Sequence, residues 1–169
     1  MMPGVVIVMG VSGCGKSSVA ARIAVELDYT MIEGDALHPS ENIARMSAGL
    51  PLRDEDRMPW LDLIGSAIRA ARAKGQGVVV TCSSLRRLYR DRLRAGAGEP
   101  LAFVWLDGSR ELIGGRMAAR QGHFMPTTLL DSQFATLEPP LGEPDCIRVD
   151  IDQTTDAVVA YAVRALRAV

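Results

Sequence analysis

Short apolar runs rich in Val and Ile alternate with longer segments of helical period along the chain. This alternation is typical of repeated strand–helix units that build a parallel sheet. The continuous run Val78–Val80 favours a central strand covered on both faces, because a strand with one wet face would alternate apolar and polar residues. Five strands are predicted: Val5–Met9, Tyr29–Glu33, Val78–Cys82, Leu101–Leu106 and Cys146–Ile151.

Helical spacing is clearest between Trp60 and Ala71, with Pro59 near the start of the pattern and Gly75 after its end. Two segments look less regular, and we expect loops there: 38–57 and 121–126. Loops of this kind often take part in binding, although surface loops without a function look the same. Further helices are predicted at Lys16–Leu27, around Arg86–Arg94, and at Ser109–Arg120, Thr127–Leu137 and Thr154–Ala168.

Composition adds limits to this α/β prediction. The 169 residues, 48% apolar and 23% charged, predict a single globular domain over residues 1–169. A formal charge of -1 provides no field for nucleic acid or an anionic membrane, so neither is expected as a partner. The apolar run near the start is far shorter than the roughly 18 residues of a membrane span. Three widely spaced cysteines predict reduced thiols, and we expect a cytoplasmic protein.

A phosphate-binding loop follows the first predicted strand. Residues 10–17 read Gly-Val-Ser-Gly-Cys-Gly-Lys-Ser, a full match to G-x-x-x-x-G-K-[ST] between a strand and a helix. An ordinary glycine-rich turn is the alternative, but it would not require every position of the motif. The glycines let backbone N–H groups surround phosphate oxygens, and the Lys adds a positive charge. We expect ATP and Mg²⁺ as cofactors, with Ser17 as metal ligand and ATP bound by Gly10, Ser12, Gly13, Cys14, Gly15, Lys16, Ser17 and Ser18.

The acidic residues follow the second predicted strand rather than the third. Many P-loop ATPases place a metal-linked Asp at the end of another apolar strand, but Thr81 and Cys82 stand there in this chain. Glu33 and Asp35 instead follow the second strand, with His38 just beyond. An Asp in this place can orient or deprotonate an acceptor hydroxyl, which is typical of a kinase for a small alcohol. The alternatives are a turn or helix-cap role for Asp35 and a structural role for His38.

Together with the phosphate loop, the blocks Gly34–Pro39 and Asn42-Ile43 resemble the gluconokinase family, small P-loop kinases that phosphorylate D-gluconate on its 6-hydroxyl. Three later blocks are also similar to that family: 51–61, 82–91 and 116–139. The likeness covers nearly the whole chain in order. Glu33 stands where many members have Asp, and Arg86 stands where Lys is usual, which keeps the charge but changes its shape.

The resemblance implies a three-layer α/β/α P-loop kinase fold with a parallel sheet of about five strands. It also implies ATP-dependent phosphorylation of D-gluconate with Mg²⁺, a homodimer, a substrate-binding segment near 36–75 and a lid near 110–127. Resemblance and chemistry together place six residues in the acceptor pocket: Asp35, His38, Arg57, Arg90, His123 and Gln133. Of these, Asp35 has the strongest support, since its position also fits a required chemical task.

On the nucleotide side, Arg116 and Arg120 lie four residues apart, hence on one helix face. They could close over ATP and neutralise charge on the transferred phosphoryl group, although a solvated basic face has the same pattern. Lys16, Asp35 and Arg120 are therefore the predicted catalytic residues. Adenine contacts are expected from the loop 150–154, by position alone.

Three other functions remain open at this point. A nucleoside monophosphate kinase should carry its own base-reading and lid motifs, which are not found. A shikimate kinase should have a glycine triplet where Cys82-Ser83-Ser84 stands. A non-catalytic nucleotide sensor would have no need of Asp35, so replacing this residue separates a sensor from a kinase.

Overall fold

The computed structural model describes residues 2–119 and 127–169 of the chain. Five parallel strands form one sheet in the order β2-β3-β1-β4-β5. The buried runs of Val and Ile in β1 and β3 explain their central positions, since helices cover both faces there. The strands are β1 (Val5–Met9), β2 (Thr30–Glu33), β3 (Val78–Thr81), β4 (Ala102–Asp107) and β5 (Cys146–Asp150).

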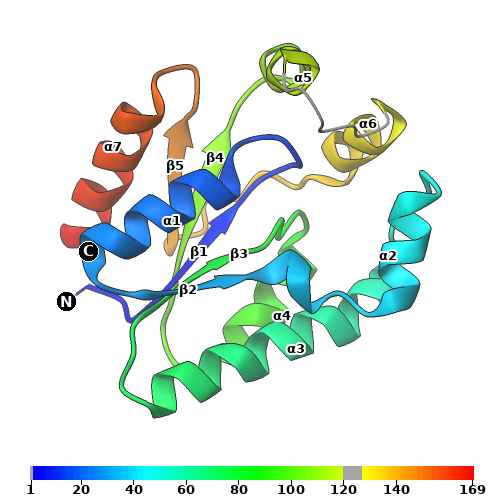
Figure 1. The fold of residues 1–169 in the computed structure, drawn as a ribbon. Coiled ribbons are helices and arrows are strands. Elements are labelled where there is room, and N and C mark those ends of the chain that lie inside the picture. The colour runs from blue at the N-terminus through cyan, green and yellow to red at the C-terminus, as the bar shows by residue number, and fades with distance from the viewer. Residues whose placement is uncertain (1, 120–126) are drawn as a thin grey trace.

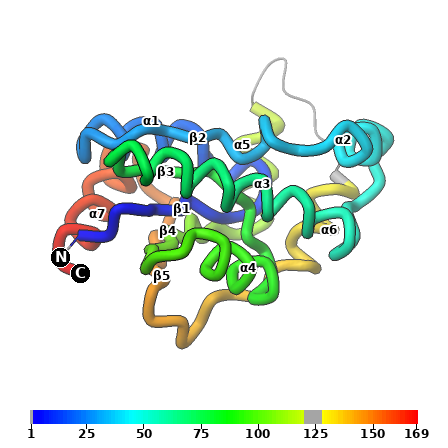
Figure 2. The backbone as a smooth tube through the Cα atoms, turned by 90° about the horizontal axis from the view of Figure 1, so that it is seen from below, coloured from blue at the N-terminus to red at the C-terminus, as the bar shows by residue number. Residues whose placement is uncertain are grey.

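Helices cover the sheet on both faces and complete three layers (Figure 1). One face is covered by α1 (Lys16–Leu27) and α7 (Thr155–Arg167), and the other by α3 (Asp54–Ala73) and α4 (Arg87–Ala97). The view from below shows α3 and α4 side by side under the sheet (Figure 2). Their backbones approach closely at two glycines: a Cβ on Gly65 would lie 3.2 Å from the Cα of Gly96. The predicted α/β/α architecture is confirmed.

The remaining helices gather beyond the carboxyl ends of the strands (Figure 1). They are the short 3-10 helix η1 (Gly34–Leu37) and the helices α2 (Ser40–Ser47), α5 (Arg110–Ala119) and α6 (Thr127–Thr136). Ligands of open parallel sheets bind at this edge. The two chain ends lie together at the opposite edge in both views (Figures 1 and 2).

Helix α2 forms inside the segment 38–57, so the prediction of a loop was wrong there. Ser40 begins the helix after Pro39, and Gly49 follows it with a φ of 77°. Helix α3 also begins earlier than the pattern around Trp60 indicated, because the Asp56 side chain accepts a hydrogen bond from the Arg53 N–H at 2.8 Å and stabilises the first turn.

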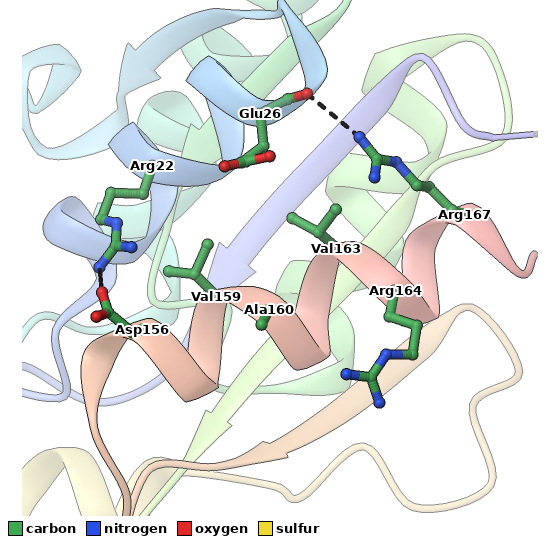
Figure 3. Close-up of a pocket in the computed structure, with 8 residues that line it drawn as sticks. All are labelled: Arg22, Glu26, Asp156, Val159, Ala160, Val163, Arg164 and Arg167. Atoms are coloured by element: carbon green, nitrogen blue, oxygen red, sulfur yellow. Dashed lines mark hydrogen bonds and ion pairs between the residues drawn. The ribbon is translucent and has the colours of Figure 1, made fainter.

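The last helix, α7, packs along α1, the helix that follows the phosphate loop, and this interface between them is called the seam (Figure 3). Arg22 forms an ion pair of 2.6 Å with Asp156, and Arg167 donates to the backbone carbonyl of Glu26 at 3.4 Å. An open hollow of about 420 Å³ follows the seam, with Val159 on its floor. Within the described residues, no helix is long and apolar enough to span a membrane.

Candidate active site

The phosphate loop connects β1 to α1 and wraps around a small hollow. Gly10, Gly13 and Gly15 have φ values of 147°, 82° and 96°, a region that residues with a Cβ rarely adopt. The Lys16 ammonium lies back across the loop and donates to the carbonyls of Gly10 at 3.0 Å and Val11 at 3.1 Å. The hollow has a volume of about 230 Å³ and is lined by Ser12, Gly13, Gly15, Lys16, Ser17, Ser18 and Asp35.

Cys14 lies inside this loop rather than on its surface. Its side chain is 4% exposed, and its sulfur lies 2.7 Å from where a Cβ on Gly10 would be. Burial raises the pKa of the Cys14 thiol, and the nearby Lys16 charge only partly opposes this rise. Cys14 therefore fills space in the loop as a neutral thiol.

The Glu33 carboxylate bridges the phosphate loop and β3. Its Oε1 accepts a hydrogen bond from the Ser17 hydroxyl at 2.8 Å and another from the Thr81 hydroxyl at 2.5 Å. Thr81 in turn accepts from the Gly34 N–H at 3.0 Å, so its position is fixed from both sides. Hydroxyl and carboxylate oxygens are the ligands that Mg²⁺ prefers, and the Ser17 and Glu33 pair fits such an ion.

Asp35 and His38 face each other at the end of β2. Asp35 stands on η1 with its side chain 73% exposed, whereas the His38 side chain is only 4% exposed. Their closest atoms, Oδ1 and Nε2, lie 3.8 Å apart. The His38 ring stacks on Trp60 with centroids 3.9 Å apart and an angle of 18° between the planes. Burial lowers the pKa of His38, the Asp35 charge opposes this shift, and the Arg57 charge adds to it.

Arg57 is a buried cation near His38. Arg57 is 6% exposed, and its Nη1 donates to the Tyr89 hydroxyl at 2.6 Å. The Tyr89 hydroxyl donates to the Asp54 carboxylate, which also binds Arg86. No carboxylate of the described residues forms an ion pair with Arg57 itself. A buried guanidinium with unused donors suits an anionic group of a substrate.

Arg90 has a different role from the one predicted. It is fully buried, and its guanidinium binds the Glu143 carboxylate at 2.9 and 2.7 Å. The other donors go to the carbonyls of Ser84 at 2.8 Å, Leu85 at 3.2 Å and Glu138 at 3.0 Å. These bonds use all five N–H groups of an arginine side chain. The structure therefore does not bring Arg90 to the acceptor pocket, because no donor is left for a substrate.

Gln133 lies against the phosphate loop. Its amide oxygen accepts a hydrogen bond of 2.6 Å from the Ser12 N–H. Gln133 therefore joins α6 directly to the loop that holds phosphate, a contact that the sequence did not indicate. The other two predicted residues near the proposed lid, Arg120 and His123, lie outside the described residues.

Arg116 lies at the mouth of a second hollow, of about 420 Å³, beside the phosphate loop. Its guanidinium donates to the Ile151 carbonyl at 2.7 Å, which links α5 to the loop after β5. Gln153 and Thr154 of that loop line the hollow together with Gly13. The hollow lies beside the phosphate loop and next to the loop after β5, where ligands of open parallel sheets bind.

Comparison with known proteins places this site in a family. A family described as an AAA domain matches residues 5–140. A gluconokinase from Gluconobacter oxydans is 45% identical, over 99% of this chain and 94% of the relative. The chain belongs to the gluconokinase family. A crystal structure of a gluconokinase from Sinorhizobium meliloti 1021 superposes with a TM-score of 0.90 at 50% identity, covering 99% of this chain and 93% of that one. An APS kinase from Mycobacterium tuberculosis, at 22% identity and a TM-score of 0.70, shows the shared fold alone.

The resemblance to the gluconokinase family and the P-loop kinase fold are thus confirmed. The sequence analysis assigned no role to two residues of the site, Thr81 and Asn42. Thr81 stands where many P-loop ATPases have an Asp, and Asn42 was part of a block that resembles the family. Thr81 could have been found from its place at a strand end next to Glu33. Asn42 follows His38 by four residues, but His38 has an extended backbone and lies before α2, so no helical pattern indicated this pair.

Proposed function

We propose that this gluconokinase-family protein transfers the γ-phosphoryl group of ATP to the 6-hydroxyl of D-gluconate and forms 6-phospho-D-gluconate. The observation that carries the proposal is the position of Asp35, which lines the same hollow as Lys16 and Ser17 of the phosphate loop. A carboxylate next to a phosphate site can accept the proton of a hydroxyl as it attacks phosphorus.

On the nucleotide side, the loop N–H groups and Lys16 bind the phosphates of ATP. Ser17 and Glu33 would hold Mg²⁺, which neutralises phosphate charge when it is bound. Arg116 reaches the adenosine side from α5. Arg120 stands four positions after Arg116 in the sequence, and we retain it as the candidate that neutralises the transferred group, within a lid at about 110–127.

On the acceptor side, the substrate-binding segment at about 36–75 supplies His38 and Arg57. Asp35 orients the 6-hydroxyl, His38 binds the polyol, and Arg57 binds the carboxylate of gluconate. His123 remains a further candidate. Gln133 connects this side to the phosphate loop through Ser12. We also propose a homodimer, which light scattering at several concentrations tests.

The test is a coupled assay of ADP release with Mg-ATP and a panel of acceptors: D-gluconate, other sugar acids, shikimate, glycerol and nucleoside monophosphates. We expect turnover with D-gluconate that falls at least about 100-fold in Asp35→Asn. That variant should still bind ATP, because the loop N–H groups and Lys16 that bind phosphate remain. ATP binding without turnover on any acceptor would support a nucleotide sensor instead, and a clear preference for another acceptor would replace gluconate.

A further inference from the structure

The side-chain amide of Asn42 binds two partners behind the acceptor site. Asn42 is 3% exposed and lies in the first turns of α2. Its Nδ2 lies 3.0 Å from the backbone carbonyl oxygen of Asp56 and 3.1 Å from Nδ1 of His38. An amide nitrogen carries two hydrogens, so both contacts can be hydrogen bonds at once.

The Asp56 carbonyl decides which way the Asn42 amide faces. A carbonyl oxygen only accepts hydrogen bonds, so the Asn42 atom next to it has to be the nitrogen. The reverse orientation would place two oxygens against each other in a buried position, which is unfavourable because neither can donate a hydrogen bond. The backbone of α3 therefore fixes the orientation of a side chain on α2.

The amide nitrogen then decides the protonation of the His38 ring. A nitrogen that carries two hydrogens can only donate to Nδ1, so Nδ1 has to accept and carries no proton. In a neutral imidazole the proton then sits on Nε2. Burial of the ring favours this neutral form, since it lowers the pKa of His38 against the influence of Asp35. The two charged groups that face the ring are Asp35 on η1 and Arg57 on α3.

We propose that Asn42 is a positioning residue that holds His38 in its Nε2–H tautomer, so that His38 donates a hydrogen bond to the acceptor hydroxyl beside Asp35. This proposal rests on the proposed kinase function. The Nε2 and Oδ1 atoms are 3.8 Å apart, and a hydroxyl oxygen can lie about 2.8 Å from both. Such a hydroxyl accepts from His38 and donates to Asp35.

The arrangement selects an alcohol and directs its proton. A carbonyl oxygen could accept from His38 but would have no hydrogen for Asp35. During transfer, the hydroxyl oxygen forms its bond to the γ-phosphorus, the bond from phosphorus to the ADP oxygen breaks, and the hydroxyl proton passes to Asp35. His38 keeps its proton throughout and orients the oxygen lone pair. Trp60 holds the ring plane, with its indole N–H bound to the Gly34 carbonyl at 2.8 Å.

The tautomer is read directly from long-range ¹H–¹⁵N spectra of protein labelled on histidine. The chain has 2 histidines, so the spectrum of His38→Gln assigns the signals of His38. We expect an Nε2-protonated ring in the wild type at pH 8. In Asn42→Asp the carboxylate can only accept, so His38 should carry a proton on Nδ1 or become doubly protonated. An Nδ1–H ring in the wild type overturns the proposal.

Kinetics test the consequence for the reaction. We expect Asn42→Ala and Asn42→Asp to lower kcat/KM for the acceptor at least about tenfold, with the KM for ATP within twofold of the wild type. Ile43→Ala is the matched control, because Ile43 is the next residue of α2 and is 51% exposed. Thermal unfolding and ATP binding show that each variant is folded. A change in the acceptor kcat/KM of less than twofold in a folded Asn42→Ala overturns the proposal.

A double-mutant cycle separates the tautomer from general packing. The amide N–H of a glutamine at position 38 replaces the Nε2–H donor and has no tautomer to fix. Asn42→Ala should therefore cost at least about tenfold in the wild type but less than about threefold in His38→Gln. Equal costs in both backgrounds would assign Asn42 a merely structural role. If gluconate fails as substrate, the same cycle is run with the acceptor that the panel identifies, and the tautomer spectrum needs no substrate.

Discussion

The amide oxygen of Gln133 accepts a hydrogen bond of 2.6 Å from the backbone N–H of Ser12. This bond spans 121 residues of sequence and brings α6 onto the loop that binds phosphate. Ser12 also lines the phosphate hollow beside Asp35. A change in the position of α6 therefore acts directly on the loop at which the phosphoryl group is transferred.

Removing the Gln133 side chain should affect turnover more than nucleotide binding. We expect Gln133→Ala to lower kcat about tenfold, because the Ser12 N–H of the phosphate loop loses its partner. The ATP dissociation constant should change less than threefold, because Lys16 and the other loop N–H groups remain. Gln133→Glu should instead weaken ATP binding, since its carboxylate places a negative charge next to phosphate. Isothermal titration with ATP and steady-state assays measure both effects. Equal losses in the two variants would contradict this explanation.

Replacement of Arg90 should lower the free energy of unfolding rather than weaken substrate binding. Arg90→Leu removes two of the hydrogen bonds to the buried Glu143 carboxylate and leaves it with Arg94, at 2.7 Å, as its partner. We expect the free energy of unfolding to fall by up to about 3 kcal/mol. Arg92→Ala is the control on the same helix: its ion pair with Asp62 is half exposed, so its loss should change the free energy of unfolding little. Urea unfolding measures both values. A stable Arg90→Leu with a raised KM for gluconate would return Arg90 to the acceptor site.

Asp56 makes the start of α3 sensitive to acid. Hydrogen bonds from the Arg53 side chain and backbone N–H lower the pKa of Asp56 from 3.8 to about 2. A carboxyl group with a lowered pKa stabilises the fold fully above its ordinary pKa and loses this contribution as the pH falls through the lowered one. The wild type should therefore exceed Asp56→Asn in free energy of unfolding above pH 4, and the difference should shrink towards pH 2. Urea unfolding across this range tests it, and a difference that is independent of pH would refute the assignment.

Gly34 should tolerate no side chain. A Cβ at this position would lie 2.0 Å from the carbonyl oxygen of Thr81. We expect Gly34→Ala to lower the free energy of unfolding by about 1–3 kcal/mol and to reduce kcat, because Glu33 and Asp35 flank the residue. Gly115→Ala is the control, since none of the described residues lies within 4 Å of its Cβ position. An alanine inside α5 should raise the free energy of unfolding by about 0.5–1 kcal/mol. Thermal unfolding compares the two, and a Gly34→Ala as stable as the wild type would contradict the close contact.

The sheet could be predicted from the sequence because its signal is local. Continuous Val and Ile runs mark buried strands, and β1 has the predicted bounds Val5–Met9. Helix α2 could not be predicted from apolar periodicity, since its stability comes from contacts beyond the helix. One is the buried Asn42 amide, and another is the Arg45 guanidinium, which binds the Pro51 carbonyl at 3.1 Å. The Asn42 contact depends on where α3 lies in space, because its partner is the Asp56 carbonyl of that helix.

The phosphate loop could be predicted because one sequence motif carries its chemistry. The acceptor site was harder to predict, because an arginine can either bind a substrate or pair with a buried carboxylate of the protein. Arg90 and Arg57 both stand in blocks that resemble the gluconokinase family. Only the structure shows that Glu143 neutralises Arg90, whereas Arg57 has a tyrosine hydroxyl as its partner. Glu143 lies 53 residues after Arg90, so no local pattern joins them.

The Gly34 peptide is clamped on both sides: its N–H binds the Thr81 hydroxyl, and its carbonyl binds the Trp60 indole. This clamp anchors Asp35 to the sheet, and hence to the phosphate loop, whatever α2 does. His38 has three supports: the Asn42 amide of α2, the Trp60 ring of α3, and the Asp35 carbonyl, which accepts from the His38 N–H at 3.3 Å. If α2 shifts when an acceptor binds, the shift changes the gap between Nε2 and Oδ1 and leaves the distance from Asp35 to phosphate as it was. The acceptor hydroxyl is therefore held between one group that is fixed to the sheet and one group whose position depends in part on α2.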